Sequence, residues 1–284
     1  MKYLLTFFSI LFLVLSSAQG ISPEKDIELG DLYQAILDQE SDESKLIASA
    51  EFKSQLKSTL FKSGAFQHPF AGLNMCKLTS PDDRFRIFNW NVPLDRGEHF
   101  YEALVVIPNG KSGMVEVIEL RDMSAEIERP EHKILKSDKW FGTLYYEIVP
   151  FKRSGGDHYA LLGWDGDSQI TTKKVIDVMV VSGNNVRFGA PVFKTERGLK
   201  KRLLFTYAEQ VSMSLIYQEK ERRFIFDHLA PKESRLEGQY QFYGPDMSFN
   251  ALNYRKGKWA WVSDVEFKRK RTNKDKDFND PRVK

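Results

Sequence analysis

The chain has 284 residues, of which 42% are hydrophobic, 13% aromatic and 29% charged. This composition is typical of a globular protein and excludes a chain that is disordered throughout. The formal net charge of +3 does not predict a nucleic-acid partner, because residues 268–284 alone carry eight basic and three acidic side chains, and the folded body before them is acidic.

The N-terminus predicts export. A positive start of two residues precedes an apolar stretch from Tyr3 to Leu15, and small or polar residues follow as far as Gly20. This pattern is typical of a cleavable secretory signal over residues 1–20. The alternative is an uncleaved membrane anchor, but a spanning helix needs about 20 apolar residues and this stretch is shorter. We therefore expect a periplasmic or extracellular protein with no transmembrane segment in the mature chain.

The first mature segment, residues 21–65, is predicted to be helical. Its apolar residues recur at helical spacing, first from Leu29 to Leu37 and then, after the capping residues Ser41 and Asp42, from Leu46 to Leu60. Residues 66–83 contain two prolines and one glycine and are predicted to form a linker or a wrapped connection.

From about Arg84 to residue 267 the hydrophobic period changes to two, which predicts β-strands joined by short turns. Successive hairpins with short loops favour antiparallel pairing, because a parallel crossover needs a dozen residues or more. The fold class is therefore predicted as mainly β (α+β), with a small helical segment before a large antiparallel β body. More than ten strands exceed one open sheet, so the body is expected to be a sandwich, a barrel or a small propeller. The predicted strands are 101–107, 114–120, 143–149, 158–164, 175–181, 186–193, 203–207, 212–217, 223–226, 250–254 and 259–262.

Residues 268–284 contain few apolar side chains and are predicted to be a basic, solvated and disordered tail. Attraction to anionic surfaces is a second interpretation of this tail.

Four blocks of the β region look like the recurring blocks of an uncharacterised family of exported proteins from Bacteroidetes-type bacteria. They are Tyr159–Gly166, Lys173–Val178, Phe226–Pro231 and Gln241–Asp246. The resemblance covers roughly residues 85–262. It implies export into the periplasm or beyond, and it implies no activity, cofactor or catalytic residue.

Asp165 and Asp167 resemble the start of a calcium loop, in which alternating carboxylates would bind one cation. The position that should hold the final glutamate is Ile176, so the pattern is incomplete. The alternative is a hairpin turn at Asp165 with Trp164 packed beneath it.

The other candidate catalytic residues are Asp177, Asp227, His228 and Asp246. Asp227 and His228 follow an apolar strand, and an acid paired with a histidine can perform acid–base chemistry. Neighbouring residues of a strand point to opposite faces, however, and hydrogen bonding at a turn is the alternative. No zinc or nucleotide motif is present, so no cofactor is predicted. The single cysteine, Cys76, cannot form an internal disulfide and is predicted to be a structural thiol.

The aromatic residues Trp164, Tyr243, Trp259 and Trp261 are candidates for a platform that binds a sugar ring or a partner protein, although aromatic residues of an all-β domain mostly fill the core. The functional prediction is a binding or scaffolding protein of the cell envelope, with an envelope protein or a glycan as its ligand. The alternative is a secreted hydrolase that uses the aspartates listed above as paired carboxylates, acting on glycans.

Overall fold

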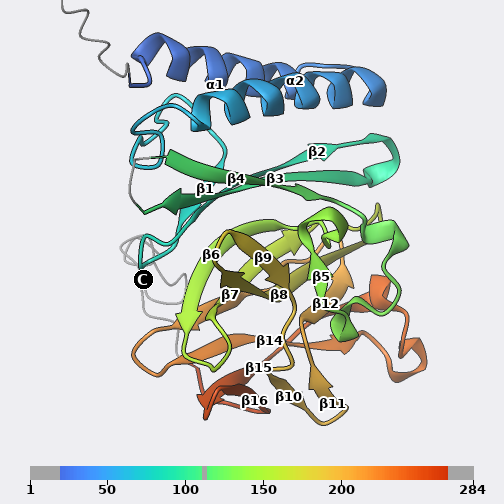
Figure 1. The fold of residues 1–284 in the computed structure, drawn as a ribbon. Helices are drawn as coiled ribbons and strands as arrows, with labels where there is room; N and C mark the ends of the chain where they lie inside the picture. Colours follow the sequence, from blue (N-terminus) through green and yellow to red (C-terminus); the bar gives the residue numbers. More distant parts are fainter. Residues whose placement is uncertain (1–19, 111–113, 268–284) are drawn as a thin grey trace, which may run out of the picture.

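The computed structural model of the protein describes residues 20–110 and 114–267. The predicted signal segment, apart from Gly20, and the predicted basic tail lie outside these ranges. The described elements form four layers, with two helices above three stacked β-sheets (Figure 1). The predicted class, a helical segment before a large antiparallel β body, is confirmed, and the sheets stack face to face as in a sandwich.

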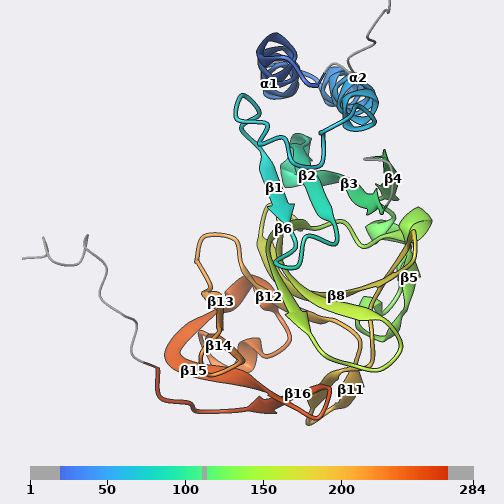
Figure 2. The ribbon, with the colours of Figure 1, turned by 60° about the vertical axis from the view of Figure 1, so that its left-hand side comes forward.

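The helical layer consists of α1 (Pro23–Leu37) and α2 (Asp42–Leu60), which Figure 2 shows nearly end-on. Serine side chains cap both N-termini. Ser22 Oγ accepts a hydrogen bond from Lys25 N at 3.3 Å, and Ser41 Oγ accepts one from Ser44 N at 3.2 Å. These bonds satisfy main-chain donors that the first helical turn leaves free, and α2 begins at the capping residues that the sequence predicts.

The first sheet is an antiparallel meander that lies directly beneath the helices. Its strands are β1 (Cys76–Thr79), β2 (Arg86–Pro93), β3 (His99–Asn109) and β4 (Met114–Arg121). Leu29 and Phe52 of the helices are fully buried in one cluster with Trp90 and Leu104 of this sheet. The helical segment and the β body therefore share a core, which we call the helix core.

The second sheet has the strand order β5-β9-β8-β7-β6, and β12 pairs with the first half of β8. The third sheet has the order β11-β10-β16-β15-β14-β13. The bounds of the second sheet are β5 (Leu135–Lys136), β6 (Leu144–Phe151), β7 (Asp157–Asp165), β8 (Thr171–Ser182), β9 (Asn185–Phe188) and β12 (Leu203–Ala208). Those of the third are β10 (Phe193–Thr195), β11 (Gly198–Lys200), β13 (Leu215–Gln218), β14 (Arg223–Pro231), β15 (Tyr243–Arg255) and β16 (Lys258–Val262).

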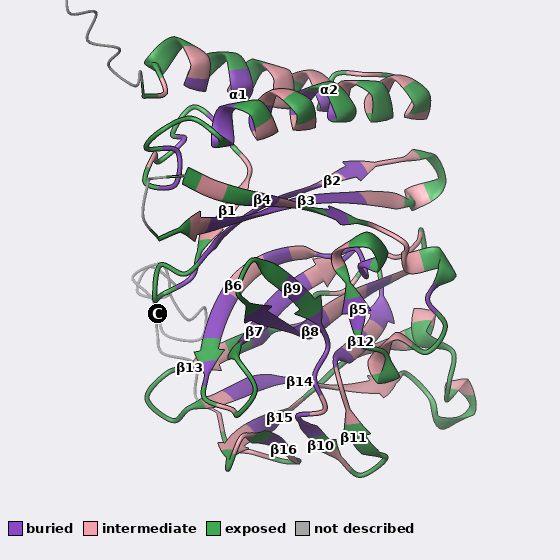
Figure 3. Cartoon of the chain, viewed as in Figure 1, coloured by how far each residue is buried: buried purple, intermediate pink, exposed green. Residues whose placement is uncertain are grey.

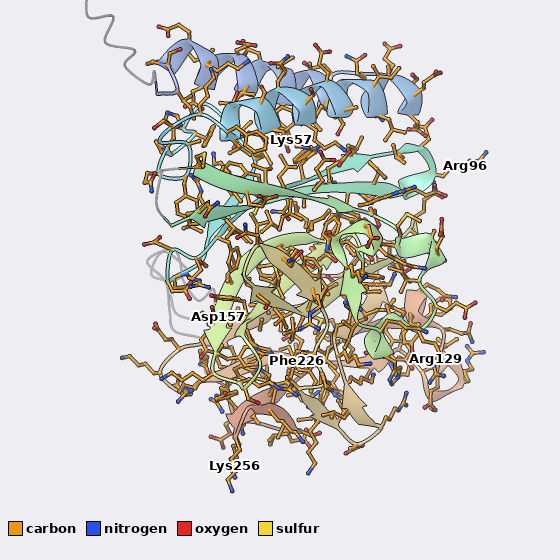
Figure 4. All side chains as sticks on the ribbon, in the orientation of Figure 1. Lys57, Arg96, Arg129, Asp157, Phe226 and Lys256 are labelled. Carbon is orange, nitrogen blue, oxygen red and sulfur yellow. The ribbon has the colours of Figure 1, made fainter. Side chains whose placement is uncertain are left out.

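Alternation along the strands of the second sheet supplies two further cores. Val175 and Met179 of β8 face the first sheet and belong to the inner core, which includes Trp140 and Tyr145. Ile176 and Val178 face the third sheet and belong to the outer core, which includes Phe205, Phe226 and Trp259. Buried residues accordingly lie between the layers in Figure 3, and side chains such as the labelled Phe226 fill these spaces in Figure 4.

The structure decides between the two interpretations of residues 66–83, and it differs from the sequence prediction in two details. Residues 66–83 are a wrapped connection rather than a free linker, because Phe70 and Leu73 are buried in the helix core and β1 lies within the segment. The predicted strand 186–193 is two strands in different sheets, since the chain turns at Gly189, whose φ is 88°. The second difference is that β10 pairs with β16 in parallel, a long-range contact that no local pattern encodes.

Within the described residues, no helix is both long and apolar enough to cross a membrane.

Candidate binding site

A groove of about 370 Å³ opens at one edge of the outer core, where the second and third sheets meet. We call it the Trp261 groove. Its walls come from four strands: Phe205 lies on β12, His228 on β14, Asn250 on β15 and Trp261 on β16. A cavity of this size, between about 300 and 1,000 Å³, is in the range that holds a small ligand.

Trp261 provides an aromatic wall of the groove. Trp259 and Trp261 share one face of β16 because side chains two residues apart point the same way. Trp259 lies deep in the outer core, whereas Trp261 lies toward the end of the strand and is half-buried. Its ring centroid lies 4.8 Å from that of Phe226 and 6.2 Å from that of Phe205, and Nε1 donates a hydrogen bond to Ser263 Oγ at 3.2 Å. These contacts fix the indole ring before any ligand arrives.

Asn250 provides the polar wall. Its side chain is buried, with 3% of the residue exposed, and a hydrogen bond of 2.9 Å joins Nδ2 to His228 Nδ1. Its Oδ1 atom is buried and has no hydrogen-bond partner among the described residues. Buried polar atoms nearly always have a partner, so Oδ1 is an unsatisfied acceptor on a residue that lines the groove.

The rim of the groove is charged. Lys200 of β11 and Glu131 form an ion pair of 2.7 Å, and both side chains line the groove. Glu196 and Arg197, in the turn between β10 and β11, are exposed beside them. The groove therefore combines an apolar wall with hydrogen-bonding groups of both kinds, which suits a ligand with an apolar face and polar edges.

Asp165 and Asp167 lie together at the turn between β7 and β8, as the hairpin interpretation predicts. Asp165 Oδ1 accepts hydrogen bonds from Asp167 N at 2.9 Å and from the Tyr101 hydroxyl at 3.2 Å. The Lys173 ammonium contacts both carboxylates, at 3.4 Å from Asp165 Oδ2 and at shorter range from Asp167. Burial raises the pKa of Asp165, and Lys173 opposes that effect.

Lys173 occupies the place between the two carboxylates where the calcium hypothesis puts the ion. Among the described residues, no three side chains of histidine, cysteine, aspartate or glutamate come close enough together to hold a metal. The arrangement supports the turn interpretation of Asp165 and Asp167 instead.

Asp177 is buried in the inner core, with no exposed surface, so it cannot contact a substrate. Its Oδ1 accepts a hydrogen bond from Val178 N at 2.7 Å. Its Oδ2 accepts one from the Tyr145 hydroxyl at 3.3 Å and lies 3.1 Å from Nε of the equally buried Arg202. The prediction of a catalytic role for Asp177 is corrected to an anchor of the fold.

Asp227 and His228 point to opposite faces of β14, as their adjacent positions require. Asp227 Oδ2 accepts a hydrogen bond of 2.7 Å from the main-chain N–H of Ser214, the residue immediately before β13. His228 lines the Trp261 groove, with Nε2 3.9 Å from Asp246 Oδ2. The six predicted catalytic residues are thus distributed over separate places, and only Asp165 with Asp167 and His228 with Asp246 come together.

The predicted aromatic platform is also divided. Trp164 lies in a different groove, and the ring of Tyr243, at the start of β15, is tilted against that of Tyr240 with 5.1 Å between the ring centroids. Trp259 is 1% exposed in the outer core, so its prediction as a binding residue is wrong, because its neighbours from the second and third sheets cover it. Of the four, Trp261 lines the groove that also contains the unpartnered oxygen of Asn250.

Asn250 is the residue of this groove that the sequence analysis missed. It alternates with Leu252 and Tyr254 on one face of β15, and all three face the outer core or its rim. An amide at an apolar position of a strand is the signal that could have identified it.

The comparisons with known proteins give no relative: no protein-family model matches the sequence, and neither the curated proteins nor the solved structures contain a match. The predicted resemblance to an exported Bacteroidetes family remains a prediction, and function has to be argued from the site.

Proposed function

We propose that this protein is an exported binding protein that takes a saccharide in the Trp261 groove. The observation that carries the proposal is the pairing of a fixed, half-buried indole with a buried, unpartnered amide oxygen on the neighbouring strand. Leu252 and Trp261 are register partners of β15 and β16, so Asn250, two residues along the same face, lies close to the indole.

A saccharide fits this chemistry because a sugar ring has an apolar C–H face and hydroxyl edges. The C–H face packs on an indole, since aromatic side chains supply a large, rigid apolar surface. A hydroxyl donates to Asn250 Oδ1, and others contact Lys200 and Glu131 at the rim. A hydroxyl that bonds to a charged group contributes more to the binding free energy than a hydroxyl that bonds to a neutral group.

The separation of the carboxylates favours binding over the hydrolase alternative. Hydrolysis of a glycosidic bond needs two carboxyl groups on either side of the bond. In the Trp261 groove, Glu131 is engaged by Lys200 and by Leu204 N, while Asp246 lies beyond His228. Among the described residues that line the groove, the other carboxylate is that of Glu196, which is exposed on the turn between β10 and β11.

Export is the second part of the proposal and rests on the apolar stretch from Tyr3 to Leu15. The test is expression of the full chain in a Gram-negative host, followed by fractionation and mass determination of the N-terminus. We expect a periplasmic or secreted product that begins after Ala18 or Gly20. A full-length product retained in the cytoplasm would contradict this part.

The binding test is a screen of the purified protein on immobilised glycans of bacterial, plant and animal origin, followed by calorimetry with the best soluble oligosaccharide. We expect Trp261→Ala to weaken binding by about 30-fold, because a central tryptophan of a binding site contributes about 2 kcal/mol or more. Tyr240→Ala is the matched control, since Tyr240 is an aromatic residue that is 47% exposed and lies outside the groove. Equal loss in both variants, or no glycan bound by the wild type, would refute the proposal.

A further inference from the structure

A second groove, of about 570 Å³, lies at the other end of β12 from the Trp261 groove. We call it the Lys174 groove. Trp164 and Lys174 contribute to it from β7 and β8, His99 from the start of β3, and Tyr207 and Glu209 from the end of β12 and the loop after it. It is therefore built between the first and second sheets, beside the loop that joins β12 to β13.

Lys174 is unusual among the lysines of the described chain. It is half-buried, yet no carboxylate lies within ion-pair distance, and its Nζ lies 4.5 Å from the centroid of the Tyr146 ring. Other half-buried lysines each reach an oxygen. Lys77 and Lys201 donate to main-chain carbonyl groups. The remaining ones pair with a carboxylate, namely Lys25, Lys45, Lys53, Lys57, Lys173 and Lys200.

A partly buried ammonium without an anion is unfavourable for the free protein. Burial removes water from the charge, and an attractive ring face at 4.5 Å replaces only part of that solvation. Burial also lowers the pKa of Lys174, and no neighbouring acid opposes the effect. The chain thus leaves a cation in a groove where an anion from outside can reach it.

The rest of the lining adds hydrogen-bond donors and an aromatic wall. Trp164 stands edge-on to His99, with 5.2 Å between ring centroids, and an indole nitrogen is always a donor. A 3.1 Å hydrogen bond joins His99 Nδ1 to Asn91 Nδ2, which assigns the ring proton to Nε2. Glu209 is the acid of this lining, and it is exposed at the rim without an ion pair to Lys174.

We propose that the Lys174 groove is a second binding site, for a small organic anion whose carboxylate pairs with Lys174 Nζ while its body packs against Trp164. The proposal does not depend on the saccharide site, because the two grooves share no lining residue. Carboxylate and phosphate oxygens both bind an ammonium, so the experiment separates the two anions.

The experiment is isothermal titration calorimetry of the full mature chain with sodium D-glucuronate, D-glucose and inorganic phosphate. We expect glucuronate to bind and glucose, its neutral counterpart, to bind at least tenfold more weakly. Lys174→Met should weaken glucuronate binding at least tenfold, Lys174→Arg should retain it, and Trp261→Ala should leave it unchanged. Binding of phosphate with the same dependence on Lys174 would support the anion site and assign it to phosphate groups.

A stability measurement distinguishes a ligand site from a structural lysine. If Lys174 serves a ligand, Lys174→Met removes an uncompensated charge and raises the melting temperature of the free protein by about 2 °C or more. Lys174→Gln, which keeps a polar end, covers the case in which the methionine variant does not fold. The proposal is overturned if neither anion binds, or if the anion that binds does so equally well in the methionine and glutamine variants.

Discussion

Asp177 of the inner core and Asn250 at the edge of the outer core differ in how their buried side-chain oxygens are partnered. In the inner core, Trp140 Nε1 donates to the Tyr145 hydroxyl at 2.9 Å, and that hydroxyl donates to Asp177, which faces Arg202. Both oxygens of Asp177 have partners within the chain. At the two ends of the outer core, Asn250 Oδ1 and Lys174 Nζ have none among the described residues.

This difference separates structural from functional polar residues. A buried polar group that is fully partnered within the chain has no capacity left for a ligand, so its removal damages the fold. A polar group without a partner costs stability, and where it lines a groove it can be reached by a ligand. Sequence candidates of the first kind, such as Asp177, lose their functional interpretation, whereas residues of the second kind gain one.

The largest effect is expected in the inner core. Asp177→Asn should lower the free energy of unfolding by about 3–5 kcal/mol, because it leaves the buried charge of Arg202 without its counter-ion. Urea unfolding followed by circular dichroism measures the change. The double replacement Asp177→Leu with Arg202→Met should recover most of the loss. If Asp177→Asn alone were as stable as the wild type, the structural role assigned to Asp177 would be wrong.

A smaller loss is expected where the first and second sheets are joined. Asn89 Oδ1 accepts from Tyr145 N at 2.6 Å, and Asn89 is fully buried. Asn89→Ala should cost about 1–3 kcal/mol, because it leaves a buried main-chain donor without an acceptor. Asn253→Ala on β15, a half-buried position, is the control and should stay within about 0.5 kcal/mol of the wild type. Equal losses in the two variants would show that Asn89 does not join the sheets.

The pH dependence of stability tests the lining of the Lys174 groove. Burial lowers the pKa of His99 below its usual 6.5, an effect that Asp165 partly opposes. The unfolded chain therefore binds a proton more readily than the folded one, so the stability from this residue is full above about pH 6.5 and is lost as pH falls through the folded pKa. His99→Gln should flatten the decline in stability between about pH 7 and pH 5.

His158 also has a pKa lowered by burial and contributes to the same decline. His158→Gln therefore serves as the comparison, and the two replacements together should flatten the profile more than either one. Unfolding by urea at a series of pH values measures these slopes. An unchanged slope in His99→Gln would mean that this ring is as accessible to protons in the folded protein as in the unfolded chain.

The smallest effect on stability is expected at Asn250. Leucine is close to asparagine in shape, and its introduction removes an unpartnered buried oxygen, so Asn250→Leu should change the free energy of unfolding by less than about 0.5 kcal/mol or increase it. His228 loses its amide partner but is exposed enough to bond to water. The same variant should lose saccharide binding. A loss of several kcal/mol would instead place Asn250 with the structural residues of the inner core.

The sequence by itself determined the order and type of most elements. Two helices with serine caps and a long series of hairpins follow from local periodicity and turn residues, because neighbouring residues decide capping, alternation and short turns. The turn at Asp165 was predicted for the same reason, since the bond between its side chain and Asp167 N spans only two residues.

Only the tertiary structure decided which of these residues meet. The parallel pairing of β10 with β16 and the juxtaposition of Trp261 with His228 join segments separated by dozens of residues, and the burial of Trp259 depends on neighbours from two sheets. Local pattern cannot distinguish an aspartate that faces Arg202 in a core from one that faces a groove, because both occupy alternating positions of a strand. Which polar groups remain without a partner depends on how the three sheets stack, and that is the physical basis of both proposed sites.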